Sequence, residues 1–192
     1  MVSAILFLAP GFEEIETTNI VDVLRRCCVE VTIAGTEPHA ISGAHDMRFI
    51  SDILIEESNV EDFEAVICPG GSPGYVNLRK NSRVLAMIQE AFNANKLVAA
   101  ICAAPAVLAD SGILRNRNCT IYPGMEKELK KGGGKPSKDL VVEDGNIITS
   151  QGPATALLFA FRIAERLVDK ETVDVVWEET LSNLVLKKLT HH

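Results

Sequence analysis

The sequence predicts an α/β protein built on one mostly parallel sheet with helices on both faces. Short apolar runs alternate along the 192-residue chain with segments of helical periodicity. These runs are continuously apolar rather than alternately polar, which is typical of strands whose two faces are both buried. The length suits one domain with a substantial core, and no linker or internal repeat interrupts the pattern. We therefore expect a single domain over residues 1–192.

The first half of the chain supplies four extended segments and two helices. The apolar run Val2–Leu8, bounded by Pro10-Gly11, predicts the first strand. The segment Glu13–Arg26 has apolar residues at helical spacing, acidic residues in its first turn and basic residues in its last, as a helix dipole favours. The sequence further predicts strands at Val29–Ala34 and Glu64–Cys68, an extended segment at Met47–Ile55 with or without a hairpin partner, and a helix at Arg83–Ala94.

The second half continues the alternation and adds a hairpin. A strand at Leu97–Ile101 leads into a short helix, Ala104–Ala109, and a strand at Asn118–Ile121 leads into the helix Met125–Lys131. An Asp-Gly-Asn turn between Leu140–Glu143 and Ile147–Ser150 predicts a small β-hairpin. The last two predicted helices are Ala154–Leu167, with Leu157, Leu158, Phe161, Ala164 and Leu167 on its core face, and Val173–Leu186.

Composition and charge exclude several classes of protein. With 47% hydrophobic and 23% charged residues, the chain has the balance of a soluble globular protein. Its formal net charge is −7, and its one lysine-rich stretch, KELKKGGGK, also contains a glutamate, so we expect no nucleic-acid partner. No run approaches the roughly 20 apolar residues of a membrane span. The start, MVSAILFLAP, has neither the positive flank nor the length of a signal peptide, and no membrane partner is expected.

The cysteines indicate a reducing compartment. There are five, an odd number, and no two form a CxxC pair, so we expect a cytoplasmic protein without a disulfide framework. None has metal-ligand spacing, and no metal or cofactor is expected. Cys27, Cys28, Cys68 and Cys119 are interpreted as packing residues. His39 is interpreted as an exposed loop residue, and the terminal His191 and His192, native or the remnant of a purification tag, receive no role.

Cys102 differs from the other cysteines in its position at the end of a predicted strand. A buried packing residue is the ordinary interpretation of a free cysteine. However, its neighbours Ala100, Ala103 and Ala104 are small, as a tight turn from strand to helix requires, and the arrangement is similar in outline to a nucleophile elbow. The helix that follows would point N–H groups at the thiol and favour its thiolate. The sequence supports a packing residue and a reactive thiol about equally.

Two further motifs follow predicted strands and are expected at the same sheet edge. Gly70-Gly71 is either a plain turn or a backbone that approaches a substrate and supplies oxyanion-hole N–H groups. Glu13, Glu14 and Glu16 open the first helix. Compensation of the helix dipole explains Glu13 and Glu14, whereas Glu16 either does the same or turns inward toward the thiol.

The motifs APGFEEIET, VDVLRR, PGGSPG, AAICAAP and TSQGPATA occur in this order from Val2 to about Val168. Together they resemble the ThiJ/PfpI superfamily, and within it the DJ-one branch. The resemblance implies a flavodoxin-like three-layer sandwich, usually a homodimer, that works without a cofactor. It also implies that Cys102 is the nucleophile, that a protonated Glu16 hydrogen-bonds its thiolate, and that Gly71 and Ala103 are the oxyanion donors, with Gly70 beside them.

Two positions depart from the family pattern, and a third separates the chain from the protease-like branch. Tyr122, in TIYPG, stands where many members of the branch have a histidine, and phenols are poor general bases near neutral pH. His45 matches a family arginine near the dimer interface, so His45 and Arg26 are candidates for contacts across that interface, although an exposed loop position is an equal reading of His45. Ala103 follows the cysteine where the protease-like branch has a histidine, which argues against a peptidase.

The sequence leaves two classes of function open. The first is a cysteine enzyme of glyoxalase or deglycase type, acting on methylglyoxal, glyoxal or their early protein adducts. The second is a redox-sensing stress protein or holdase chaperone whose Cys102 is oxidised to a sulfinate. Both use the same thiol, whose pKa is expected to be low provided that Glu16 is protonated. No residue supports a role in thiamine biosynthesis, a label that attaches to the family by name.

Overall fold

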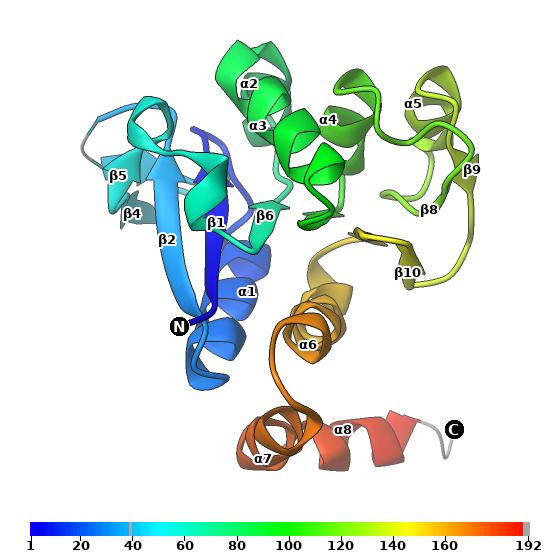
Figure 1. Cartoon of the computed structure of the whole chain (residues 1–192). Coiled ribbons are helices and arrows are strands. Elements are labelled where there is room, and N and C mark those ends of the chain that lie inside the picture. Colours follow the sequence, from blue (N-terminus) through cyan, green and yellow to red (C-terminus); the bar gives the residue numbers. More distant parts are fainter. Residues whose placement is uncertain (39, 190–192) are drawn as a thin grey trace.

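A seven-stranded sheet runs through the centre of the molecule in the order β10-β11-β7-β6-β1-β2-β5 (Figure 1). This computed structural model describes the fold of residues 1–38 and 40–189. The strands are β1 (Ser3–Leu8), β2 (Glu30–Gly35), β5 (Ile53–Leu54), β6 (Ala65–Cys68), β7 (Leu97–Ile101), β10 (Val141–Asp144) and β11 (Ile147–Ser150). Their pairings are parallel apart from the β10–β11 hairpin. The predicted mostly parallel sheet and the small hairpin are therefore confirmed.

Two small two-stranded sheets lie outside the central one. Strand β3 (Ala40–Ser42) pairs antiparallel with β4 (Arg48–Ile50), so the extended segment predicted around Met47–Ile55 does have a hairpin partner. Strand β8 (Asn118–Cys119) pairs with β9 (Lys135–Pro136). The prediction of a longer strand at Asn118–Ile121 is wrong. After two residues the backbone leaves the ladder, because the Thr120 N–H donates to the Thr149 hydroxyl at 2.8 Å.

Helices cover both faces of the sheet and complete the three layers (Figure 1). On one face lie α1 (Glu14–Arg26) and α6 (Ala156–Leu167), with α7 (Lys170–Glu179) packed behind α6 through an edge-to-face contact of Phe161 and Trp177. The other face carries α2 (Gly74–Lys80), α3 (Ser82–Asn93), α4 (Pro105–Asp110) and α5 (Glu126–Lys131). Short 3₁₀ turns lie at Ile55–Glu57, Val60–Asp62 and Pro153–Thr155, and α8 (Ser182–Leu189) follows α7.

Three helical predictions need correction. Helix α2 was not predicted, and the single helix expected at Val173–Leu186 is divided into α7 and α8. The division falls at Leu181, whose φ of 58° lies in the left-handed region and cannot continue an α-helix. The core face of α6 is also turned: Phe159, Ala160 and Ile163 are fully buried, whereas Leu157 and Leu158 are half-buried.

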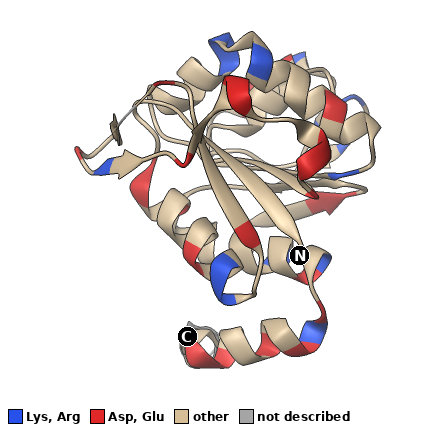
Figure 2. Ribbon diagram, turned by 60° about the vertical axis from the view of Figure 1, so that its left-hand side comes forward, with Lys and Arg blue, Asp and Glu red and all other residues tan. Residues whose placement is uncertain are grey.

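Charged residues lie mainly on helices and loops, and the central strands are mostly uncharged (Figure 2). This distribution agrees with the burial of the strands between two apolar clusters, one under each layer of helices. Within the described residues, no helix combines the length and the apolar character needed to cross a membrane. His39, His191 and His192 lie outside the described residues.

The topology brings three loops together at one edge of the sheet. Strands β7, β6 and β1 are neighbours, and their carboxyl ends lead into Cys102–Ala104, Pro69–Pro73 and Ala9–Glu13 respectively. Backbone hydrogen bonds join two of these loops, from the Glu13 N–H to the Gly70 carbonyl at 3.1 Å and from the Gly74 N–H to the Gly11 carbonyl at 3.0 Å. The three motifs singled out in the sequence therefore lie together at the carboxyl edge of the sheet, where ligands bind in folds of this kind.

Candidate active site

Cys102 occupies a strained turn between β7 and α4. Its φ of 62° is in the left-handed region, which costs a non-glycine residue about 1–2 kcal/mol and is typical of functional sites. Both of its backbone groups are held: the Cys102 N–H donates to the Ser150 carbonyl at 3.0 Å, and the Tyr122 N–H donates to the Cys102 carbonyl at 2.8 Å. The side chain is half-buried, so the turn leaves the thiol partly open at this edge of the sheet rather than enclosed in the core.

Glycine is required at position 70 because Cys102 and Glu16 come so close to it. A Cβ atom at Gly70 would lie 2.6 Å from the Cys102 Cβ and 2.8 Å from Glu16 Oε2. Gly71 has a φ of 91°, and a Cβ there would lie 2.4 Å from the Glu13 nitrogen. The functional interpretation of Gly70-Gly71, a backbone that must approach the site, therefore describes its geometry better than a plain turn.

The Glu16 side chain turns inward, which is the second of the two alternatives that the sequence left open for it. Its side chain is completely buried, and its Oε2 accepts a 2.7 Å hydrogen bond from the Gly70 N–H. The other oxygen, Oε1, has no hydrogen bond among the described residues, and the Cys102 thiol lies near enough to the carboxyl for each group to influence the pKa of the other. Burial raises the pKa of Glu16 to about 7, the neighbouring Glu13 adds to the rise, and the Gly70 N–H opposes it.

The Cys102 thiol is not the low-pKa group that its helix position suggests. Burial and the adjacent Glu16 carboxylate raise its pKa to about 12, while the N–H groups of Gly71 and Ala103 lower it. Because two buried acids that repel each other lose their protons in separate steps, the pair holds a single proton above about pH 7. The sulfur is an anion when that proton resides on Glu16, which is the condition under which the sequence-based expectation was made.

The predicted oxyanion donors also lie at the sulfur. The backbone N–H groups of Gly71 and Ala103 both lie near enough to Cys102 Sγ to lower the pKa of the thiol. An oxygen on a carbon bonded to Sγ would lie beside the same two groups, and fixed donors of this kind stabilise negative charge that develops there. The structure thus brings Cys102, Glu16, Gly70, Gly71 and Ala103 together.

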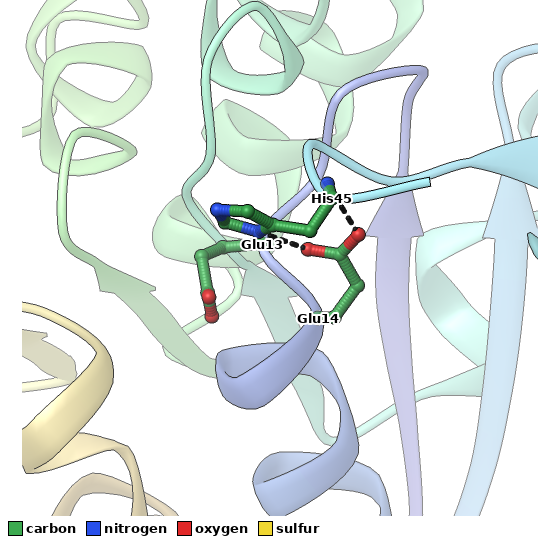
Figure 3. A group of neighbouring side chains, drawn as sticks. All are labelled: Glu13, Glu14 and His45. Atoms are coloured by element: carbon green, nitrogen blue, oxygen red, sulfur yellow. Dashed lines mark hydrogen bonds and ion pairs between the residues drawn. The ribbon is translucent and has the colours of Figure 1, made fainter. Parts of the chain in front are cut away.

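A second group of polar side chains lies at the start of α1 (Figure 3). Glu13 caps the helix, since its Oε2 accepts the Glu16 N–H at 2.7 Å. Glu14 reaches back to the loop before β4: its Oε1 accepts the His45 N–H at 2.6 Å, and its Oε2 lies 2.9 Å from His45 Nδ1. One potential ligand atom from each of Glu13, Glu14 and His45 lies within 4.8 Å of the others, so this is the group of described residues that could hold a metal ion.

None of the remaining predicted positions has a hydrogen bond to the Cys102 sulfur among the described residues. His45 pairs with Glu14 of its own chain, which raises the pKa of the imidazole, and its side chain is 74% exposed. Arg26 forms a 2.7 Å exposed ion pair with Asp22 one helical turn earlier. Tyr122 is 49% exposed, and its N–H holds the Cys102 carbonyl.

Sequence reasoning missed the hydroxyl network that supports the elbow. Ser150, whose carbonyl accepts the Cys102 N–H, shares a 2.6 Å hydrogen bond between its hydroxyl and that of Thr155. Thr155 also accepts the Gly152 N–H at 3.1 Å. These residues all belong to the motif TSQGPATA, which was noted in the sequence. The motif by itself does not indicate that its hydroxyl groups bond to one another.

The other cysteines divide differently from the expectation. Cys27, Cys68 and Cys119 are buried, in agreement with a packing role, and burial raises the pKa of each thiol. Cys28 is exposed and adopts a φ of 60° directly after α1. Its interpretation as a packing residue is therefore wrong, because the chain turns outward at the end of the helix.

Comparisons with known proteins agree with this architecture. The sequence profile described as "DJ-1/PfpI family" matches residues 2–166. "Protein dj-1beta" of Drosophila melanogaster is 39% identical, over 91% of this chain and 94% of its own. Its crystal structure superposes with a TM-score of 0.88 at 38% identity, covering 94% of this chain and 97% of that one. A Caenorhabditis elegans relative named "Glutathione-independent glyoxalase DJR-1.2" is 34% identical, over 88% of this chain and 90% of its own.

The elbow, the buried glutamate and the glycine turn lie within the matched residues, and the flavodoxin-like fold is shared with the solved relative. The resemblance in the sequence motifs is thereby confirmed along nearly the whole chain. This chain belongs to the DJ-1/PfpI family, and within it to the DJ-1 branch.

Proposed function

We propose that this protein is a cysteine-dependent enzyme of glyoxalase or deglycase type that converts α-oxoaldehydes or their early protein adducts and protects the cell from them. The observation that carries the proposal is that the half-buried Cys102 and the buried Glu16 carboxyl meet at Gly70, with the N–H groups of Gly71 and Ala103 near the sulfur. A nucleophile, a proton carrier and two oxyanion donors meet there. The named activity of the nematode relative supports the same chemistry.

The proposed reaction begins with the attack of Cys102 Sγ on the aldehyde carbon of R–CO–CHO. The S–C bond forms, the carbonyl electron pair moves to oxygen beside Gly71 and Ala103, and Glu16 gives that oxygen its proton. Glu16 then carries a proton from this carbon to the adjacent one through an enediol, which leaves a thioester of a 2-hydroxy acid. Water breaks the S–C bond, and the sum of the steps is R–CO–CHO + H₂O → R–CHOH–COOH.

Deglycation differs only in the first step and then follows the same reaction sequence. In an early adduct the aldehyde carbon carries a hydroxyl group and a protein amine. Attack by Cys102 Sγ forms the S–C bond and breaks the C–N bond, and the amine leaves with the Glu16 proton. A steady-state assay of methylglyoxal consumption and lactate formation tests the proposal. Recovery of unmodified lysine side chains in a methylglyoxal-treated peptide tests the deglycase reaction.

A second candidate function is redox sensing or a holdase chaperone role through the same thiol. Cys102 is half-buried but accessible, and Glu16 Oε1 is free to hydrogen-bond an oxygen added to sulfur. All five cysteines are free thiols, which supports the proposal of a reducing, cytoplasmic location for either function.

Mild hydrogen peroxide is expected to convert Cys102 to a sulfinate before any other cysteine is modified. The competitor is Cys28, which is exposed but follows the carboxyl end of α1, whereas Cys102 precedes the amino end of α4 and lies beside Glu16. Peptide mass mapping over a peroxide titration measures the order, and Cys28→Ser is the control that removes the competitor. Sulfinate that appears first on Cys28 or Cys119 would exclude the redox role of Cys102.

We further propose that the chain forms a homodimer with two-fold symmetry through α1 and the β4 loop. A shallow groove of about 630 Å³ lies on this surface between Val21, Arg25 and Phe49. Three exposed apolar side chains lie on the same two segments, Ile15, Met47 and Ile50. Burial of such a surface between copies is the usual way to cover it.

The double substitution Ile15→Asp/Ile50→Asp is expected to give monomers by light scattering at the concentration where the wild type is a dimer. His45 lies in the same loop and is proposed to face the partner's site, where its protonation would modulate the thiol. His45→Ala should then change the pH dependence of Cys102 alkylation in the dimer only. A monomeric wild type, or an unchanged profile, would contradict the proposed role of His45.

A further inference from the structure

Tyr122 is a large residue whose backbone is hydrogen-bonded to that of the nucleophile. Its N–H donates to the Cys102 carbonyl at 2.8 Å. Its ring lies against Gly152, where a Cβ atom would be 3.4 Å from Cδ2 and 3.7 Å from Cε2. Gly152 follows closely after Ser150, whose carbonyl accepts the Cys102 N–H. The ring therefore bridges the two segments that hold the nucleophile.

The ring is only half-covered by the rest of the chain. It remains 49% exposed, and within the described part of the chain its phenol oxygen has no hydrogen bond. The groups that surround the sulfur offer a substrate no comparable apolar surface, since Gly70 and Gly71 lack side chains, Ala103 has one methyl group, and Glu16 is polar. An α-oxoaldehyde bound at Cys102 needs a place for its substituent R, and the open aromatic surface is beside the elbow.

We propose that the ring of Tyr122 is the specificity-determining contact of this site, favouring α-oxoaldehydes with an aromatic substituent over methylglyoxal. This inference rests on the function proposed above and names the substrate class within it. Offset stacking of two rings adds to the gain from burying apolar area, and a methyl group forfeits most of both. Because phenols are poor general bases at neutral pH, the ring is expected to act through binding rather than proton transfer.

Steady-state kinetics with phenylglyoxal and methylglyoxal test the proposal in the full-length protein. In Tyr122→Ala, the ratio of kcat/KM for phenylglyoxal to that for methylglyoxal should fall about tenfold, mostly through KM for phenylglyoxal. Tyr122→Phe is the matched control and should keep the wild-type ratio, because it retains the ring. Equal losses on both substrates, or a fall carried by kcat, would show that Tyr122 only supports the elbow and would overturn the proposal.

A second measurement does not depend on turnover. Phenacyl bromide and bromoacetone both alkylate a thiol with loss of bromide, and they differ only in a phenyl or a methyl group beside the carbonyl. Their ratio of second-order rate constants at Cys102 should fall about tenfold in Tyr122→Ala and stay at the wild-type value in Tyr122→Phe. If the protein shows no turnover but this ratio changes, the proposed enzymatic function is refuted while the contact of Tyr122 with an aromatic substituent is supported. An unchanged ratio would refute the contact itself.

Discussion

Replacing Cys102 by serine is expected to lower kcat/KM for methylglyoxal by at least about 1000-fold, to the level of the solution reaction. A serine hydroxyl is a weaker nucleophile than a thiol and needs a strong base to become one. In the proposed mechanism Glu16 gives its proton to the substrate oxygen, so it is not free to take one from a serine hydroxyl during the attack. The described histidine nearest to the site, His45, is engaged with Glu14.

Cys28→Ser is the matched control for this experiment. It makes the same chemical change at the exposed cysteine after α1, and wild-type turnover is expected. Cys102→Ser keeps a side chain of nearly the same shape at the strained φ of 62°, so the unfolding temperatures of both variants should remain close to that of the wild type. Residual turnover above about a tenth of the wild-type rate in a folded Cys102→Ser protein would contradict a nucleophilic role for this residue.

The fold was accessible from the sequence because its strands are apolar throughout and bounded by glycine and proline. Helix α2 was missed for the opposite reason: Gly74–Lys80 follows PGGSP, has little apolar periodicity, and packs against α3, α4 and β1. The break at Leu181 was also missed, since a leucine rarely adopts the left-handed region and no residue type at this position indicates that it does.

The candidate site was predictable where chemistry and chain position coincide, as at Cys102 and Gly71. It was not predictable where it depends on contacts across the chain. Glu14 and His45 are 31 positions apart, and nothing in either motif indicates their pairing. The direction of the thiol pKa was also misjudged, because a pattern shows the helix end that lowers it but not the burial that raises it.

The second large effect concerns Glu16, and Glu16→Gln separates its two roles. The amide can still donate a hydrogen bond to the sulfur but cannot carry a proton. We therefore expect kcat to fall about 100- to 1000-fold while Cys102 remains open to alkylation. Removal of the carboxylate charge also removes a cause of the raised thiol pKa, so the two-step pH profile of alkylation should become a single rise. Turnover close to that of the wild type would exclude Glu16 as the proton carrier.

The same substitution should change how stability depends on pH. Because burial raises the pKa of Glu16 in the folded protein to about 7 from its ordinary 4.5, the native state binds the extra proton between these values. Stability attributable to this group is complete below pH 4.5 and is lost as the pH rises to about 7, by on the order of 3 kcal/mol at about 1.4 kcal/mol per tenfold change in proton affinity.

The glutamine in Glu16→Gln has no proton to lose. The free energy of unfolding of this variant, measured by urea denaturation, should therefore lack the fall that Glu16 causes in the wild type between pH 4.5 and about 7. Glu178→Gln, on the exposed surface of α7, is the control and should follow the wild type across the same pH range. A Glu16→Gln protein whose stability falls with pH as steeply as that of the wild type would show that Glu16 is ionised in the native state at pH 5. In that case it could not donate a proton to the sulfur, and the shared-proton pair would have to be abandoned.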